Sequence, residues 1–331
     1  MSAHPGILGA VAALALAACG SDTDRGGPGG TTTTTTTSVT TTSGTGTSTV
    51  PTSDCPDALA PLADQGQVET VGDGTAASCT EAALRAAVTT LNGVAGGGTI
   101  HFDCGGEATL TLASSLLVTA PLLVDGGGVV TLSGGGTTRV FELDHYVDFA
   151  VQRLTIANGV APDSGGAILH PWYGTLRAVD VRFVNNHALS LESDIGGGAV
   201  FAGGLTTAVF SGCVFEGNSA SNGGGLLNRG SDLTVIDTAF VDNAALSTGD
   251  GQFGNGGGLY IDGMNYDVPG DFRMCGAVFT QNRAQTHGSA VFSYFYPGSH
   301  SFIDRTLFEG NHFDGSPSGG AGGLYHEAVP L

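Results

Sequence analysis

Two short motifs alternate along the second half of the chain, and their repetition restricts the possible fold more than any other feature. The opening motif, two glycines (Gly-Ser in one copy) followed by two small or apolar residues, occupies residues 165–168, 197–200, 224–227, 257–260, 288–291 and 322–325. The closing motif, Phe-x-x-Asn, occupies residues 183–186, 215–218, 240–243, 279–282 and 308–311. One repeat takes roughly 25 to 35 residues, which is typical of a solenoid built from stacked units.

The residues before each closing Phe predict short strands. Apolar or small residues stand seven and five positions before it, a strand-like spacing of two: Leu176 and Ala178, Ala208 and Phe210, Leu233 and Val235, Phe272 and Met274, Ser301 and Ile303. Other residues then break the alternation and predict a corner: Asp180, Gly212, Asp237, Gly276 and Arg305. Each repeat therefore has three short strands and one apolar face. Because no repeat can bury that face alone, equivalent strands must stack in parallel about 4.8 Å apart.

The glycines and the recurring Asn predict the turns of this stack. Glycine accepts positive φ and allows close approach of two backbones. The closing Asn is expected in the left-handed region, with its side-chain amide bonded along the stack, at Asn186, Asn218, Asn243, Asn282 and Asn311. The closing phenylalanines should form one internal column: Phe183, Phe215, Phe240, Phe279 and Phe308. These features predict an all-β fold, a single-stranded parallel β-helix.

The alternating motifs resemble the passenger repeats of the chlamydial polymorphic outer membrane proteins. More broadly, they resemble the right-handed parallel β-helix, or pectin-lyase-like, repeat proteins of bacterial surfaces. The resemblance covers about half of the chain, and it implies surface display and adhesion. The sequence shows no C-terminal barrel segment of an autotransporter, and a different anchor is expected at its front.

The N-terminal residues predict that anchor. Residues 7–18 are an uninterrupted apolar or small run, too short to span a bilayer and typical of a signal peptide. The run ends in Leu-Ala-Ala-Cys, which resembles the bacterial lipobox, with Cys19 as the lipidated residue. Residues 1–18 are therefore expected to be a lipoprotein signal peptide, and residues 19–54 a disordered Thr/Gly-rich tether. The residues after Cys19 imply, by resemblance, sorting to the outer membrane, facing the cell surface or the periplasm.

The folded part is predicted to span residues 55–331, as roughly eight or nine rungs behind an N-terminal cap. Residues 78–81 have capping-box spacing, and a helix is expected to follow and to end at residues 92–93. The apolar stripe of this helix, Leu84, Ala87, Val88 and Leu91, would cover the exposed first rung.

The cysteines are expected to include one disulfide at the cap. A bond between Cys79 and Cys104 would staple the cap to the core, with Cys55 as a competing partner. Cys213 occupies an inward position and is expected in the core. The Cys and His spacings fit no zinc motif, so neither a structural metal nor a cofactor is predicted.

The charge of the chain limits its partners. The net charge is −20 with only 10 basic residues. Nucleic acid and anionic lipid surfaces are therefore unfavourable partners. Solubility of a glycine-rich surface protein explains the charge, although scattered carboxylates that bind Ca²⁺ are an alternative.

Three longer loops carry aromatic residues at the same point of the repeat, and stacking should bring them to one flank of the solenoid. They contain Trp172 and Tyr173, Tyr266, and Tyr294 and Tyr296. Exposed rings beside carboxylates are suited to binding sugar rings or a partner protein. Alternatively, these rings cover the apolar edge of their own loops.

Catalysis is the competing reading, because lyases and hydrolases of the pectin-lyase-like fold are common. Asp180 and Asp237 share a corner, but Gly212 stands between them, so their carboxylates should lie about 9 to 10 Å apart. The expected function is therefore a noncatalytic, lipid-anchored surface protein that adheres to a glycan or protein. A polysaccharide lyase or glycoside hydrolase is the alternative, and a purely structural envelope protein is the third. The oligomeric state and the cover of the C-terminal rung stay open.

Overall fold

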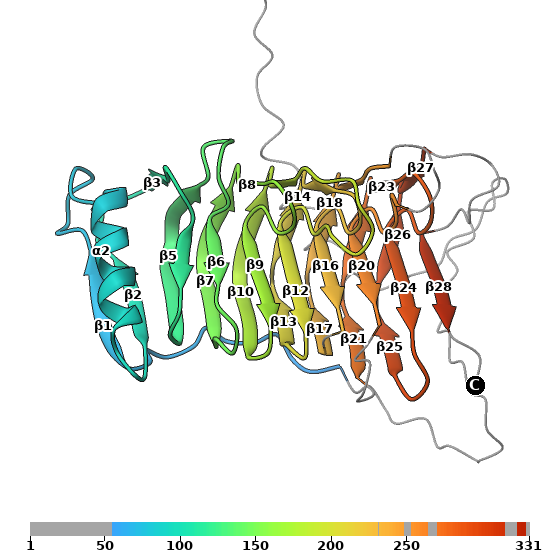
Figure 1. The fold of residues 1–331 in the computed structure, drawn as a ribbon, viewed down its shortest axis with the longest axis horizontal. Helices are drawn as coiled ribbons and strands as arrows, with labels where there is room; N and C mark the ends of the chain where they lie inside the picture. The colour runs from blue at the N-terminus through green and yellow to red at the C-terminus, as the bar shows by residue number, and fades with distance from the viewer. Residues whose placement is uncertain (1–54, 231, 248–252, 264–269, 315–322, 329–331) are drawn as a thin grey trace, which may run out of the picture. The chain divides into compact units, whose positions relative to one another are not determined.

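The computed structural model describes residues 55–230, 232–247, 253–263, 270–314 and 323–328, which form a parallel β-helix of about eight turns. Neighbouring strands pair in parallel from the first rung to the last (Figure 1). The predicted all-β parallel β-helix with an N-terminal capping helix is therefore confirmed. The expected signal peptide, the lipidation site Cys19, the tether (19–54) and the aromatic residue Tyr266 lie outside the described residues.

Three sheets form the walls of the solenoid. Sheet I has 14 strands, and its main path is β1 (Gln67–Val71), β2 (Gly98–Phe102), β5 (Leu122–Ser133), β7 (Phe149–Ala157), β10 (Thr175–Val184), β13 (Thr207–Ser211), β17 (Asp232–Ile236), β21 (Asp271–Cys275) and β25 (His300–Asp304). Around the corner of each repeat, sheet I continues in β3 (Ala108–Thr111), β14 (Val214–Glu216), β18 (Ala239–Val241), β22 (Val278–Thr280) and β26 (Leu307–Glu309).

The other two walls are narrower. Sheet II has eight strands: β4 (Leu116–Val118), β6 (Phe141–Leu143), β9 (Ile168–Trp172), β12 (Val200–Gly204), β16 (Leu226–Arg229), β20 (Leu259–Asp262), β24 (Val291–Phe295) and β28 (Leu324–Ala328). Sheet III has six very short strands: β8 (Val160–Ala161), β11 (His187–Ala188), β15 (Ser219–Ala220), β19 (Ala244–Ala245), β23 (Arg283–Ala284) and β27 (His312–Phe313). One rung therefore runs through sheet II, the two parts of sheet I and sheet III.

The closing phenylalanines stack ring on ring inside the solenoid. From Phe183 through Phe215, Phe240 and Phe279 to Phe308, successive ring centroids are 4.6, 4.7, 4.6 and 5.2 Å apart. The first four rings are fully buried, and Phe308 packs half-buried against the same core in the last rung. The ring spacing matches the distance between hydrogen-bonded strands, so the strand register holds the rings face to face. The predicted column is confirmed.

The closing asparagines form a continuous amide ladder, as predicted. The Nδ2 groups of Asn186, Asn218, Asn243 and Asn282 each donate to the Oδ1 of the Asn in the following rung, at 3.1, 2.9, 2.9 and 2.9 Å. Each also donates to a backbone carbonyl of the preceding rung, as Asn218 does to the Phe183 oxygen at 3.0 Å. The ladder thus satisfies polar groups that would otherwise be buried without partners.

The predicted left-handed conformation of these asparagines is wrong by one position. The residue before each Asn has the positive φ, at 52°, 65°, 50°, 56° and 61°: Asn185, Gly217, Asp242, Gln281 and Gly310. This residue reverses the chain direction, and the following Asn can then point inward, where its amide contacts the backbone of the preceding rung and the Asn side chain of the following rung.

The opening motifs are in register one residue earlier than predicted in three repeats. Leu226 pairs with Val200 and with Leu259, so the equivalent motifs begin at residues 223 and 256 rather than 224 and 257. Leu324 pairs with Val291, which shifts the last motif in the same way. Three successive glycines at 223–225 and 256–258 allowed either alignment of the sequence.

The middle glycine of the opening motif stands where two backbones nearly touch. A Cβ atom on Gly224 would lie 2.3 Å from the Gly257 oxygen and 2.5 Å from the Ala244 nitrogen. A Cβ on Gly198 would lie 2.2 Å from the Gly224 oxygen. Glycine at these positions therefore lets sheet II and sheet III meet at a sharp turn.

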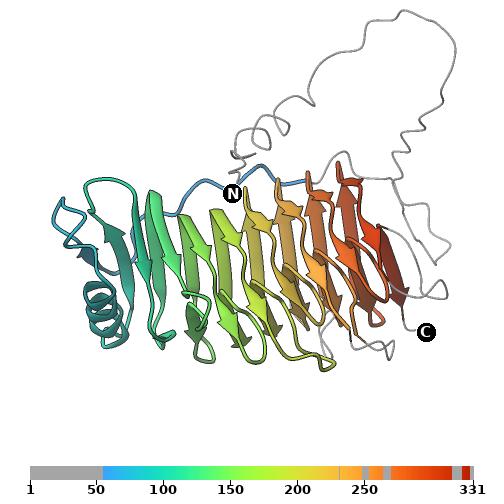
Figure 2. The same ribbon diagram turned by 90° about the horizontal axis from the view of Figure 1, so that it is seen from above.

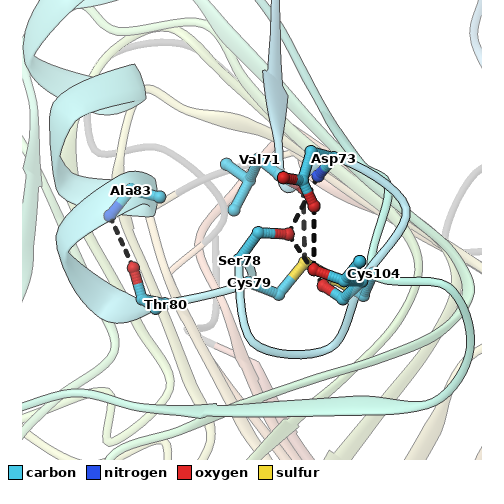
Figure 3. The surroundings of a disulfide bond; sticks show 8 residues. Val71, Asp73, Ser78, Cys79, Thr80, Ala83 and Cys104 are labelled. Atoms are coloured by element: carbon cyan, nitrogen blue, oxygen red, sulfur yellow. Dashed lines mark hydrogen bonds between the residues drawn. A yellow bond between two sulfur atoms is a disulfide. The ribbon is translucent and has the colours of Figure 1, made fainter.

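The capping helix α2 (Glu81–Asn92) lies across the N-terminal end of the stack (Figure 1). The four predicted apolar residues, Leu84, Ala87, Val88 and Leu91, are buried, and Gly93 follows the helix. The predicted N-cap at Ser78 is wrong, because the Thr80 side chain accepts the hydrogen bond from the Ala83 nitrogen, at 3.1 Å. The Ser78 hydroxyl is used in the preceding turn, where it accepts from the Asp73 nitrogen at 2.9 Å (Figure 3).

Two disulfides fasten the N-terminal segments of the described chain to the solenoid. The predicted bond between Cys79 and Cys104 is present beside the start of α2, with Cα atoms 5.4 Å apart (Figure 3). Cys55 does not compete for this bond, because it pairs with Cys275, 220 residues further along the chain. Cys213 is a free, buried thiol, as predicted, and burial raises its pKa to about 12.

Candidate functional site

Two of the three predicted aromatic loops, those of Trp172 and Tyr294, lie at the same end of sheet II, where its strands turn into sheet I. Trp172 ends β9, Tyr173 follows it, and Tyr294 belongs to β24 with Tyr296 just beyond. Four strand steps separate β9 from β24, through β12, β16 and β20, which corresponds to about 19 Å. The rings therefore share a flank but fall into two clusters.

The first cluster, named here the aromatic platform, consists of Tyr146, Trp172 and Tyr173. The Tyr146 and Tyr173 rings are parallel within 1°, with centroids 4.5 Å apart, and the Trp172 and Tyr173 centroids are 6.3 Å apart. Tyr146 is 71% exposed and Trp172 is 48% exposed. The Tyr146 ring thus stacks on Tyr173, Trp172 is tilted by 45° to Tyr173, and the exposed rings present apolar surface to solvent.

The two tyrosines of the platform have a strained backbone conformation with positive φ, at the turns from which their rings project. Tyr146 and Tyr173 have φ of 67° and 60°, which is uncommon for bulky residues. Successive turns are tied together, since the Tyr146 nitrogen donates to the Trp172 oxygen and the Tyr173 nitrogen donates to the Gly204 oxygen, both at 3.0 Å. Leu205 continues the column with φ of 60° and is 39% exposed. Asn, Asp or Gly would adopt this conformation more readily, so the tyrosines are unusual here.

Glycine makes room for the indole. A Cβ atom on Gly204 would lie 2.1 Å from Cζ3 of Trp172, so the Trp172 ring rests on the backbone of the next rung. Sequence reasoning missed Tyr146, because its turn lies before the first regular motif. Tyr146 lies between two apolar strand-like segments, β6 and β7, just as Tyr173 lies between β9 and β10, and this equivalence could have identified it.

A buried histidine supports the platform from inside. His170 is fully buried, and its Nε2 lies 3.0 Å from the Val147 oxygen while its Nδ1 lies 3.2 Å from the Thr206 hydroxyl. Burial lowers the pKa of His170 below its usual value. A neutral ring that donates to Val147 and accepts from Thr206 satisfies both contacts, and it fixes the turns that carry Tyr146 and Tyr173.

The second cluster, named the Arg229 cluster, surrounds one guanidinium on the outer face of sheet II. The Arg229 Nη2 lies 3.2 Å from Oδ2 of Asp194, and the Arg229 Nε lies 4.0 Å from Oδ2 of Asp262. Tyr294 pairs with Asp262 in the strand register, and its ring meets Tyr296 edge-on at 5.5 Å. Two carboxylates, one cation and two phenol rings thus lie on adjacent rungs.

The carboxylates of the Arg229 cluster differ in environment. Asp194 has 54% of its side chain exposed, whereas Asp262 has 20%. Burial, and then the Asp194 charge, raise the pKa of Asp262, although Arg229 opposes this. Burial, and then the Asp262 and Asp194 charges, also raise the pKa of Tyr260. A partly buried acid with a raised pKa beside a second, exposed carboxylate is an arrangement that acid–base catalysis uses.

The corner carboxylates are placed as predicted. Asp180 and Asp237 have φ of 54° and 45° at equivalent corners, and Gly212 stands between them. Each Asp side chain lies over the glycine of the following rung, because a Cβ on Gly212 would be 2.5 Å from Oδ1 of Asp180, and one on Gly276 would be 2.1 Å from Oδ1 of Asp237. Glycine therefore follows each of these aspartates in the next rung, because a larger residue would clash with the Asp side chain.

A surface pocket of about 420 Å³ lies beside the bulge of β5, where sequence reasoning predicted no site. Its polar groups are Glu107 and the side chains of Thr109, Thr131 and Thr155, which occupy successive strands in register. Threonine is common on exposed strands, so these hydroxyls alone do not indicate a ligand.

In the described part of the chain, no three His, Cys, Asp or Glu side chains come together as metal ligands. Over the same residues, no helix has the length and apolar character needed to cross a bilayer. Comparison of the chain with protein-family models, with curated proteins and with solved structures gave no significant match.

Proposed function

We propose that this protein is an exported, lipid-anchored β-helix that binds an uncharged glycan through the aromatic platform. The observation that carries the proposal is the parallel pair of Tyr146 and Tyr173 beside Trp172, in which Tyr146 and Trp172 are exposed and both tyrosines have positive φ. We further propose a relationship with the pectin-lyase-like surface proteins whose repeats the opening and closing motifs resemble.

Export is supported by the cysteines. Two disulfides join Cys55 to Cys275 and Cys79 to Cys104, and such bonds persist mainly in oxidising compartments. The lipobox-like sequence before Cys19 supports an anchor, and the Thr/Gly-rich residues after it support a tether.

The chemistry around the platform favours neutral sugars. The apolar face of a pyranose ring stacks on an aromatic ring, and the outer face of Tyr146 is open. Asp144 and Asp148 are exposed in the same turn and can accept hydrogen bonds from sugar hydroxyls. A net charge of −20 repels acidic polysaccharides, so an uncharged glycan is the better ligand.

A glycan array probed with the purified full chain tests this proposal. Tyr146→Ala and Trp172→Ala should each weaken binding to the best glycan about tenfold, since one stacked ring contributes about 1 kcal/mol or more. Leu189→Ala is the matched control, because Leu189 is 62% exposed on another wall. Unchanged binding by both platform variants would remove the platform from this function. A purely structural envelope protein would bind no glycan at all.

The Arg229 cluster supports a second candidate, a glycoside hydrolase or lyase. The specific observation is the raised pKa of Asp262 beside the exposed carboxylate of Asp194. In such a reaction, protonated Asp262 would act as the acid and Asp194 as the second carboxylate. Release of reducing ends from the glycan that binds, lost in Asp262→Asn, would favour this candidate. Equal and negligible turnover by wild type and variant would leave the noncatalytic function.

A further inference from the structure

Residues 55–65, named here the strap, run along the outer face of sheet I from the C-terminal rungs back to the cap (Figures 1 and 2). Contacts of the strap fall on the strands of sheet I in strict order. They are Cys55 with Cys275 on β21, Leu59 with Ser211 on β13, Ala60 with Arg177 on β10, Leu62 with Gln152 on β7, and Gln65 with Thr99 on β2.

Side chains of sheet I bind the strap backbone as a neighbouring strand would. Gln152 accepts from the Leu62 nitrogen at 2.6 Å and donates to the Leu62 oxygen at 3.1 Å. The Thr99 hydroxyl accepts from the Gln65 nitrogen at 2.7 Å and donates to the Gln65 oxygen at 3.0 Å. Specific hydrogen bonds therefore hold the strap to sheet I, and the strap begins at the Cys55–Cys275 disulfide.

The length of the strap matches the distance it covers. From β21 to β2 there are six strand steps, through β17, β13, β10, β7 and β5, or about 29 Å. Ten residue steps from Cys55 to Gln65 span about 31 Å in an extended, polyproline-like chain. Pro56 and Pro61 favour that conformation, so the strap is nearly taut.

The strap also covers a column of outward-facing side chains. Residues that stand in register beneath it are at most 3% exposed: Asp125, Gln152, Val179, Ser211 and Ile236. Val179 and Ile236 are apolar, so loss of the strap would expose them to water.

Apart from the disulfide and the packing over this column, a row of single and paired hydrogen bonds holds the strap. Bonds arranged in a row and pulled from one end break one after another, and each contributes only about 1 kcal/mol. Tension on the residues before Cys55 would peel such a row toward β1 and then α2. A covalent bond at the first residue prevents this.

We infer that the Cys55–Cys275 disulfide is a mechanical clip that carries force applied to the N-terminal segment. Tension from the N-terminal segment enters the solenoid at β21 and bypasses the strap, β1 and α2. This inference rests on the proposed role of residues 19–54 as a tether, but it does not depend on the glycan. A force on the tether therefore leaves the N-terminal cap in place, and the aromatic platform stays folded under load.

Constant-force stretching of the full chain, held at its two ends, tests the clip. In the oxidised protein, unfolding should release only the 56 residues after Cys275, about 20 nm, beyond the N-terminal segment. Cys55→Ala with Cys275→Ala should release the strap first, at lower force, and should make about 79 nm more chain available from the 220 residues between these positions. Cys79→Ala with Cys104→Ala is the matched control, and it should keep the high force of the first event.

Reduction of the folded wild type in place gives the same comparison if the double variant does not fold. Equal first-event forces with and without the disulfide would overturn the inference, as would peptide mapping that finds Cys55 unpaired. The glycan array on the same variants separates the two proposals. Loss of glycan binding in Trp172→Ala leaves the clip unaffected, and equal first-event forces with and without the disulfide, in proteins that still bind glycan, would refute the clip alone.

Discussion

The amide of Asn218 donates to Oδ1 of Asn243 at 2.9 Å, and the backbone nitrogen of Asn218 donates to the same oxygen at 3.1 Å. Asn243 in turn donates to the Phe215 oxygen at 2.9 Å. One buried side chain thus satisfies three polar groups in the rung before it. The ladder couples neighbouring rungs more specifically than apolar packing alone, because each amide has only one arrangement that uses all its partners.

Asn243→Ala should reduce the free energy of unfolding by about 2 to 4 kcal/mol, because the buried Asn218 nitrogen loses its acceptor and the buried Phe215 oxygen loses its side-chain donor. Denaturant unfolding of the purified protein measures this change. Asn185→Gly is the control, since the exposed Asn185 has φ of 52°, which glycine adopts freely. An equal loss of unfolding free energy in both variants would show that the amide ladder does not contribute specifically to stability.

Phe240→Ala should cost about 3 to 5 kcal/mol, because it opens a cavity in the middle of the ring column. Phe308→Ala in the last rung should cost less, because Phe308 is only partly buried and its site can relax. Thermal and denaturant unfolding of the two variants compares them directly. A larger loss from Phe308→Ala would contradict a core centred on the inner rungs.

Gly224→Ala should prevent stable folding, or cost several kcal/mol, because its Cβ atom would overlap the Gly257 oxygen at 2.3 Å. Gly96→Ala offers a control in the same chain, since no heavy atom lies within 4 Å of the added Cβ. The control should be neutral or slightly stabilising. Soluble yield and circular dichroism of both variants provide the measurement.

His170 should make stability fall in mild acid. Because burial lowers its folded pKa, the unfolded chain takes up a proton near pH 6.5 while the folded chain does not. The free energy of unfolding should therefore decrease as pH falls below about 6.5, by up to about 1.4 kcal/mol per pH unit, until the folded pKa is reached. His170→Gln should flatten this dependence between pH 7 and pH 5, and the exposed His145→Gln should not. Parallel profiles for all three proteins would exclude His170 as the cause.

Cys213 should resist alkylation in the folded protein. With a pKa of about 12, only about one thiol in ten thousand is ionised at pH 8. Iodoacetamide followed by peptide mapping should label Cys213 only after denaturation. Rapid labelling of the native chain would contradict its burial in the core.

Most of the fold could be predicted from the repeating motifs, because the residues that pack and bond between rungs recur at fixed positions within each repeat. Phe240 and Asn243 occur at fixed offsets within one rung, and stacking makes them neighbours of their own copies. Errors arose where local chemistry allowed two answers. Three glycines at 223–225 fit two registers, and a left-handed residue suits either Asp242 or Asn243.

The candidate site was less predictable than the fold. Tyr294 and Tyr296 were expected on the flank that carries Trp172. Their distance from Trp172 depends on the number of strands between β9 and β24, which the motifs alone do not give. Tyr146 lies before the regular motifs, and the partners of Arg229 come from separate loops and rungs. The Cys55–Cys275 pairing leaves no local sequence signal, because 220 residues separate the two cysteines.

The taut strap also constrains how a solenoid of this kind can change its size. Deleting one repeat between β2 and β21 would leave about 4.8 Å of slack, and duplicating one would stretch the strap to about 34 Å, close to the maximum of about 33 to 36 Å for ten residue steps. The length of the strap therefore restricts the number of repeats between β2 and β21. Repeats after β21 can be gained or lost in evolution without affecting the disulfide.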